Sequence, residues 1–217
     1  MIQESDVELI VTAIKDISSK RRLVVINYEP AFALYNSELR RYHIKENQTI
    51  SPADYHEIVE ELLTKRATVR AMSLLKSKDY AEAELVSKLK TGHYPDVAIE
   101  HAIAYVKNYG YIDDRRYVDN YIQFKASQKS KRQIVQFLSN KGIDRHMIEQ
   151  ACEEFYDQDT NPELDLLIRQ IEKKRIDPDN FSYEEKQKFL NSFYRKGFQI
   201  DLVKKALDIV LEQRYND

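Results

Sequence analysis

An internal repeat of helix pairs is the feature that most constrains how this chain folds. From Ser51 to the end of the sequence, apolar residues recur at spacings of three and four, which is the periodicity of amphipathic helices. Residues 85–89 align with residues 134–138 and 189–193, and in each copy another apolar residue follows ten positions later. Three copies in register predict a tandem helical repeat rather than a chance likeness between two helices.

Each repeat also carries a glycine between its two helices. The three glycines are Gly92, Gly142 and Gly197. Gly92 stands one residue early, and His93 holds the matching place. Glycine at this point is typical of a left-handed helix end before a tight turn. Ahead of each pair the sequence leaves room for one further helix, at residues 64–77, 114–127 and 162–175.

The first fifty residues have a different pattern, which predicts a small sheet. Residues 9–14 and 23–28 are rich in β-branched side chains, and residues 18–20 between them fit a hairpin loop. Pro30 breaks the second run, and residues 32–35 offer a short third strand. Two strands alone are marginally stable, so we expect this head to lean on a third strand or on a helix.

These patterns predict a mainly α fold class. Three tandem three-helix units, similar to helix-turn-helix modules, are expected to form an elongated, curved body behind a small N-terminal β-rich head, because short units bury too little apolar surface alone. The predicted parts are a head over residues 1–50 and helical repeats over residues 51–110, 111–158 and 159–217.

Composition narrows the possible functions. The 217 residues are 42% hydrophobic and 32% charged, and no apolar run reaches the roughly 18 residues of a membrane span. Four glycines in all argue against a phosphate-cradling loop, and a single cysteine excludes an internal disulfide and a thiolate metal cluster. The histidines lack metal-ligand spacing, and the first residues show no secretory signal. We therefore expect a cytoplasmic, non-enzymatic protein without metal or cofactor and with no membrane contact.

The net charge of −2 hides an uneven distribution. Residues 65–145 carry 16 basic and 9 acidic side chains, a net charge of +7. Residues 1–63 carry a net charge of −4, and residues 157–217 carry −2. The middle of the chain is thus the part that suits phosphate groups or an acidic partner.

An ordered set of motifs in the first two repeats resembles the RecX family of recombinase regulators. The motifs are residues 109–117 (Tyr-Gly-Tyr-Ile-Asp-Asp-Arg-Arg-Tyr), 131–134 (Lys-Arg-Gln-Ile) and 137–143 (Phe-Leu-Ser-Asn-Lys-Gly-Ile), preceded by helices at 71–75 and 83–89. The resemblance covers residues 64–156 well and 157–217 more loosely. It departs from the family where Gln-Lys-Ser replaces a common glycine before the second motif, and where His93 stands at a glycine position.

The resemblance implies a non-enzymatic protein that binds RecA in its filament on single-stranded DNA. It implies inhibition of strand exchange and of ATP hydrolysis, either by blocking filament extension or by promoting disassembly. Linked repeats with several weak contacts would give avidity without a deep pocket. We expect a monomer, with at most weak non-specific DNA contact.

The densest cluster of positive charge is the candidate contact site. Its members are Arg115, Arg116, Lys125, Lys129, Lys131 and Arg132. Facing an acidic filament surface or the DNA backbone is one interpretation of this cluster, and a solvated helix surface is the other. Asp113 or Asp114 fits the N-cap of the following helix, and Asp114 is also a candidate for a polar interface contact.

Several aromatic and sulfur side chains are predicted to lie in the core rather than to act on a ligand. The aromatic members, which fall on apolar stripes, are Tyr105, Tyr117, Tyr121 and Phe155. Cys152 takes the repeat position of Ile103 and Leu207, which predicts a small buried hydrophobe rather than a nucleophile.

A general nucleic-acid-binding helix-repeat protein is the alternative function. Three-helix units can place their second helix in a DNA groove. Against this, only the middle of the chain is basic, and no Arg/Asn/Gln pattern repeats across the units. Salt dependence separates the two hypotheses, because a pure DNA binder loses affinity steeply with salt.

Overall fold

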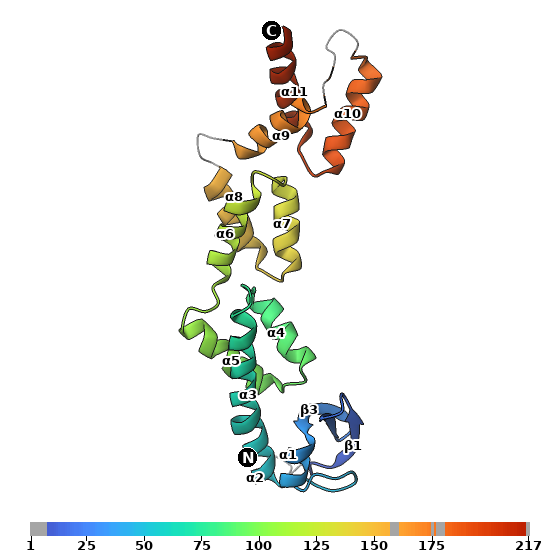
Figure 1. Ribbon diagram of the computed structural model, residues 1–217, viewed down its shortest axis with the longest axis vertical. Helices are drawn as coiled ribbons and strands as arrows, with labels where there is room; N and C mark the ends of the chain where they lie inside the picture. The colour runs from blue at the N-terminus through green and yellow to red at the C-terminus, as the bar shows by residue number, and fades with distance from the viewer. Residues whose placement is uncertain (1–7, 157–160, 175, 177–180, 216–217) are drawn as a thin grey trace, which may run out of the picture. The chain divides into compact units, whose positions relative to one another are not determined.

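The computed structural model describes residues 8–156, 161–174, 176 and 181–215. The chain divides into two compact units, residues 1–113 and residues 114–217. The described residues are mainly helical, with one small sheet near the N-terminus, which confirms the predicted fold class (Figure 1).

The head is a three-stranded antiparallel sheet in the order β1-β2-β3. Strand β1 is Val11–Asp16, β2 is Arg21–Ile26 and β3 is Glu29–Tyr35. The three predicted strands are confirmed, but the second ends before Asn27 and Tyr28, and the third begins at Glu29 and so includes Pro30. These two residues have φ values of 49° and 69°, so they form a two-residue hairpin turn that twists with the strands. Sequence reading missed this turn because tyrosine is an unusual residue at positive φ.

The helices of the first unit follow the sheet directly. They are α1 (Asn36–Arg41), α2 (Pro52–His56), the π-helix η1 (Glu57–Leu63), α3 (Thr64–Leu75), α4 (Glu82–Thr91) and α5 (Asp96–Asn108). Helix α2 begins as the sequence predicts, because the Ser51 side chain accepts a hydrogen bond from the Asp54 amide and Pro52 takes the first helical position.

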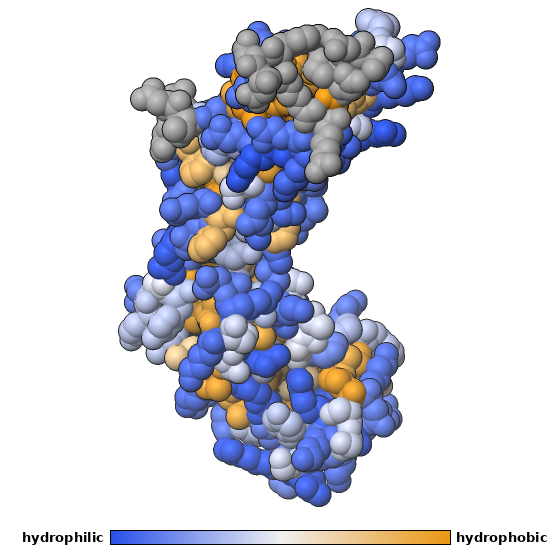
Figure 2. Space-filling model, turned by 45° about the horizontal axis from the view of Figure 1, so that its top comes forward, coloured by the Kyte–Doolittle hydropathy of each residue, from blue (hydrophilic) through white to orange (hydrophobic). Residues whose placement is uncertain are grey.

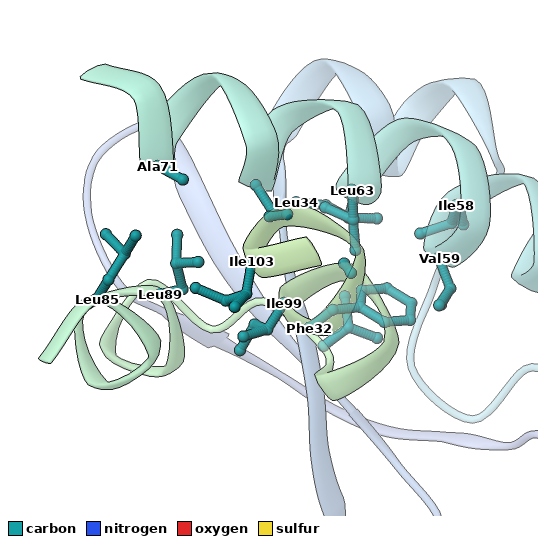
Figure 3. Packing of buried hydrophobic residues seen from close by; sticks show 14 of the residues in the cluster. Phe32, Leu34, Ile58, Val59, Leu63, Ala71, Leu85, Leu89, Ile99 and Ile103 are labelled. Carbon is teal, nitrogen blue, oxygen red and sulfur yellow. The ribbon is translucent and has the colours of Figure 1, made fainter. Parts of the chain in front are cut away.

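One hydrophobic core joins the head to the helices of the first unit. Figure 3 shows Phe32 of β3 beside Ile99 of α5, with Leu63 of η1 above them. All three side chains are buried, and the same cluster reaches Val11 of β1 and Leu85 of α4. The expectation that the sheet leans on a helix is therefore confirmed.

The second unit holds two further sets of three helices. The first set is α6 (Asp114–Lys125), α7 (Lys131–Asn140) and α8 (Arg145–Tyr156), and the second is α9 (Pro162–Glu172), α10 (Tyr183–Arg195) and α11 (Ile200–Tyr215). The extra helices predicted ahead of each pair are therefore present as α3, α6 and α9.

The turns inside the helix pairs follow the repeat register. Gly142 and Gly197 have φ values of 78° and 91°, in the left-handed region. In the first repeat Gly92 keeps a φ of −78°, and His93 takes the left-handed position with a φ of 57°. His93 is therefore the backbone equivalent of Gly142 and Gly197, and in the first repeat a histidine takes the place of glycine.

The prediction that Tyr105 lies in the core is wrong. The residue is 41% exposed, and its ring lies against that of Tyr109 in a tilted arrangement with a centroid distance of 4.7 Å. Helix α5 fills its buried stripe with smaller side chains, including Ile103 and Val106 on either side of it, so the larger ring lies outside. The other three aromatics, Tyr117, Tyr121 and Phe155, are half-buried at the edge of the core rather than inside it.

Candidate functional site

The predicted basic residues lie on α6, on the turn after it and on the start of α7. Helix α6 begins at Asp114, so Asp113 stands just before its first residue, where the sequence predicts a cap. Arg116 is exposed and Asp114 is half-buried. Arg115 lines one groove, together with Asp119 and Glu154, whereas Lys129 and Arg132 line another.

Arg115 is held by acidic neighbours inside its own repeat. Its guanidinium pairs with the Asp119 carboxylate at 2.9 Å and also with Glu154 on α8. The hydrogen bond to Glu154, followed in importance by the one to Asp119, raises the pKa of Arg115. The hydrogen bond between Arg115 and Glu154 also lowers the pKa of Glu154. Arg115 therefore links α6 to α8 by an ion pair.

The lysines around the α6–α7 turn also make contacts within the unit. The Lys125 Nζ donates a hydrogen bond to the Gln128 side chain at 3.1 Å. The Lys131 Nζ lies 5.5 Å from the centre of the Tyr156 ring, a cation–π contact. Lys125 and Lys131 thus make contacts within the repeat, and two further members of the cluster, Lys129 and Arg132, share a groove.

Lys129 and Arg132 line a groove of about 590 Å³ between the start of α7 and the end of α10. Its lining residues are Lys129, Arg132, Gln133, Gln136, Phe137, Asn140, Tyr194, Arg195, Lys196 and Gly197. Four of these side chains are cationic and none is acidic. Such a groove suits a polyanion, because Lys and Arg replace the counterions of phosphate groups. We call it the α7–α10 groove.

Two aromatic rings lie among the cations of the α7–α10 groove. Tyr194 is 50% exposed. Phe137 stacks flat on Tyr121, with ring centres 4.3 Å apart, and Lys141 approaches its ring at 5.5 Å. A positive groove with accessible rings has the two properties that single-stranded nucleic-acid sites combine, charge for the backbone and a surface for bases.

Buried polar contacts fix the two walls of the groove. Ser130 is fully buried and caps α7, where its Oγ accepts a hydrogen bond from the Gln133 amide at 3.3 Å. The same Oγ donates to the Lys196 carbonyl at the end of α10, at 3.0 Å. On the other side, the Glu163 carboxylate of α9 accepts from the Lys131 amide at 2.9 Å. These bonds join the second and third repeats within this unit.

Glu163 carries a buried carboxylate at this junction. Burial raises its pKa, and the Lys131 amide and charge act in the opposite direction. Arg169, also on α9, donates to the Ser127 carbonyl in the turn before α7, at 3.3 Å. Glu163 and Arg169 do not line the groove, so their contacts lie beside it.

Sequence reasoning missed Tyr194, Arg195 and Lys196. The signal was present, because residues 138–143 (Leu-Ser-Asn-Lys-Gly-Ile) and 193–198 (Phe-Tyr-Arg-Lys-Gly-Phe) share the pattern apolar-x-x-Lys-Gly-apolar. The glycine within this pattern was one of the residues that placed the third repeat in register. It gave no indication that the end of α10 approaches the start of α7.

Cys152 is buried in the second repeat, as predicted. Its exposed fraction is 0%, and burial raises the pKa of its thiol. A thiol in this state is a poor nucleophile.

Cys152→Ser is expected to lower the free energy of unfolding by about 1–3 kcal/mol, because a hydroxyl enters an apolar layer. Urea unfolding measures the change, with Cys152→Ala as a control that removes volume without adding a polar group. Rapid labelling of the native thiol by a maleimide would contradict its burial.

The described residues offer few other chemical sites. In that part of the chain, no three or more His, Cys, Asp or Glu side chains come together to hold a metal ion. The helices described there include none that is both long and apolar enough to cross a membrane. Hydrophilic residues cover most of the face seen in Figure 2, and apolar atoms reach it in separate patches.

Comparison with known proteins supports the repeat. Residues 113–151 match the family model described as RecX, second three-helix domain, and residues 161–207 match the third three-helix domain. A crystal structure of regulatory protein RecX superposes with a TM-score of 0.60 at 19% identity, covering 92% of this chain and 99% of that one. RecX from Lactobacillus salivarius gives a TM-score of 0.61 at 22% identity, over 68% of this chain and 96% of that one. These two structures share the fold.

Sequence relatives extend the match over nearly the whole chain. Regulatory protein RecX of Caldanaerobacter subterraneus subsp. tengcongensis is 31% identical over 202 residues, which cover 93% of this chain and 99% of the relative. Regulatory protein RecX of Legionella pneumophila is 34% identical over 137 residues, covering 63% of this chain and 89% of the relative. The three-helix repeats and this full-length likeness lead to one conclusion: the chain belongs to the RecX family.

Proposed function

We propose that this protein binds the RecA filament on single-stranded DNA and inhibits its recombinase and ATPase activities, by blocking filament extension or by promoting disassembly. The observation that carries the proposal is the match over 202 residues to a relative named as a regulatory protein. A regulator of this kind acts through a surface and without catalysis of its own. We propose further that it works as a monomer in the cytoplasm.

The α7–α10 groove supports a filament partner. A nucleoprotein filament offers both phosphate groups and acidic protein surface, and a groove lined by four cations and no acidic side chain suits either. Arg132 and Lys129 belong to the cluster predicted from the sequence, and Arg195 and Lys196 extend it. The buried bonds of Ser130 and Glu163 hold the groove in shape before a partner arrives, which reduces the ordering cost of binding.

Direct binding to single-stranded nucleic acid is the second candidate function. The specific observation in its favour is the presence of Tyr194 and Phe137 among the cations of the groove. In this alternative the recombinase is unnecessary, and affinity falls steeply as salt is raised.

Binding assays with and without RecA separate the two functions. Co-sedimentation of the full-length protein is measured with a poly(dT) strand alone, and with RecA filaments formed on that strand with a slowly hydrolysed ATP analogue. The proposal predicts tighter binding to the filament, with a shallower salt dependence than on the bare strand. Equal affinity with and without RecA, falling together with salt, would favour the second function.

A further inference from the structure

Three arginines from two elements meet where the head joins the first repeat. Arg21 starts β2, and Arg66 and Arg70 lie one turn apart on α3. The guanidinium carbons of Arg66 and Arg21 lie 4.8 and 5.9 Å from the centre of the same Tyr35 ring. Like charges repel at this range, and an anion bound between them offsets the repulsion.

Tyr94, on a third segment, lies near the same three arginines. Burial raises the pKa of its hydroxyl, and the positive charges of Arg21, Arg66 and Arg70 act in the opposite direction. The turn before Tyr94 also touches the cluster, because the Arg21 guanidinium donates to the Gly92 carbonyl at 2.7 Å. The three arginines are therefore close neighbours, although they are up to 49 residues apart in sequence.

Within the described part of the chain, a single carboxylate pairs with this cluster. Glu38 pairs with Arg66, and both side chains are largely buried. Among the described residues, neither Arg21 nor Arg70 forms an ion pair or donates to a carboxylate. Three guanidinium groups against one carboxylate leave a local excess of two positive charges.

Two guanidinium nitrogens in the cluster are buried without a protein acceptor. They are the Nε of Arg21 and an Nη of Arg66, and no described residue accepts a hydrogen bond from either. A buried charged donor left without a partner destabilises the folded state by more than a neutral one. Arg70, which has no hydrogen-bond partner in the described part of the chain, is exposed and gives access from solvent.

We propose that Arg21, Arg66 and Arg70 form a binding site for a phosphate group at the junction of the head and α3. A phosphate offers three or more acceptor oxygens, enough for donors that come from separate side chains, whereas a carboxylate offers two. Its charge of about −1.5 to −2 as a monoester at pH 7 matches the local excess. Guanidinium groups are also the side chains best shaped to bind phosphate oxygens in pairs.

The site gives the head a role apart from the α7–α10 groove. Arg21 comes from the sheet and Arg66 from the helix, so a bound phosphate would fasten the head to the first repeat by charge as well as by apolar packing. Tyr35, 39% exposed beside the guanidinium groups, offers a ring to a nucleotide base. A free phosphate ion, a nucleotide and the terminal phosphate of a nucleic-acid strand share the required chemistry, whereas a backbone diester carries a single negative charge.

Thermal unfolding of the full-length protein tests the site without any recombinase. Inorganic phosphate is titrated at constant ionic strength, balanced with sodium chloride, and the melting temperature should rise and saturate. Arg70→Gln is expected to remove the saturable rise, since this exposed residue supports no other contact. Lys65→Gln, an exposed cation on the same helix and outside the cluster, should keep it.

Two further ligands identify the source of the phosphate. A 5′-mononucleotide and a short single-stranded oligonucleotide that carries a 5′-phosphate are titrated in the same way and by calorimetry. Stronger binding of either, lost in Arg70→Gln, supports the site and assigns its ligand. A rise that does not saturate for any ligand, or that is equal in all three proteins, would overturn the proposal. Because RecA is absent, this result is independent of the filament function.

Discussion

Gly197→Ala is expected to lower the free energy of unfolding by about 2–4 kcal/mol. Gly197 has a φ of 91°, where a Cβ atom is strained by about 1–2 kcal/mol. An added Cβ would also lie 2.7 Å from the Ser130 Oγ and 3.3 Å from the Arg132 Cβ. Relieving that clash displaces Ser130 from the Lys196 carbonyl, which costs about 1 kcal/mol more.

Gly110→Ala is the matched control for this prediction. Gly110 has a comparable φ of 67°, and a Cβ there meets nothing within 4 Å. This variant therefore reports the backbone strain alone, and urea unfolding of both variants isolates the effect of the close approach. Equal destabilisation by the two substitutions would contradict the account of the Ser130–Gly197 contact.

Reversing the charge of the α7–α10 groove is expected to weaken filament inhibition strongly. Arg132, Arg195 and Lys196, all exposed, are replaced together by glutamate. Attraction to an anionic partner then becomes repulsion, and the protein concentration for half-inhibition should rise at least about tenfold, or about 1.4 kcal/mol of binding free energy. Circular dichroism checks that the helices remain.

A second triple variant keeps the same change in net charge. Lys173, Lys188 and Lys205 are exposed cations of the third repeat that do not line the groove, and their replacement by glutamate should leave inhibition within about twofold. Similar losses in both triple variants would show that overall charge, and not the groove, governs binding.

Local signals in the sequence predicted the repeat with its turns. Helical periodicity and left-handed glycines depend on neighbouring residues only. The alignment of the helix pairs therefore located α3, α6 and α9, and it matched His93 to a glycine position whose backbone is left-handed. The exposed ring of Tyr105 was mispredicted because a stripe drawn by spacing alone does not say which of two adjacent positions the core fills.

The binding surfaces could not be predicted in the same way. Arg132 and Lys196 line one groove, at a junction where Ser130 bonds to the end of α10, 66 residues further along the chain. Arg21 and Arg66 meet only because the sheet packs on α3. Both surfaces depend on tertiary contacts, and a charge count along the chain cannot show them. The same count made Arg115 a candidate for binding, although Asp119 and Glu154 pair with its guanidinium.

The most direct test of the central claim is single-stranded-DNA-dependent ATP hydrolysis by the host RecA, with this protein titrated below stoichiometry. We expect inhibition at well under one copy per RecA monomer, because blocking growth or promoting disassembly multiplies the effect of each bound molecule. Unchanged hydrolysis at equimolar protein, with the DNA saturated by RecA, would contradict the regulator function and leave direct nucleic-acid binding as the function to pursue.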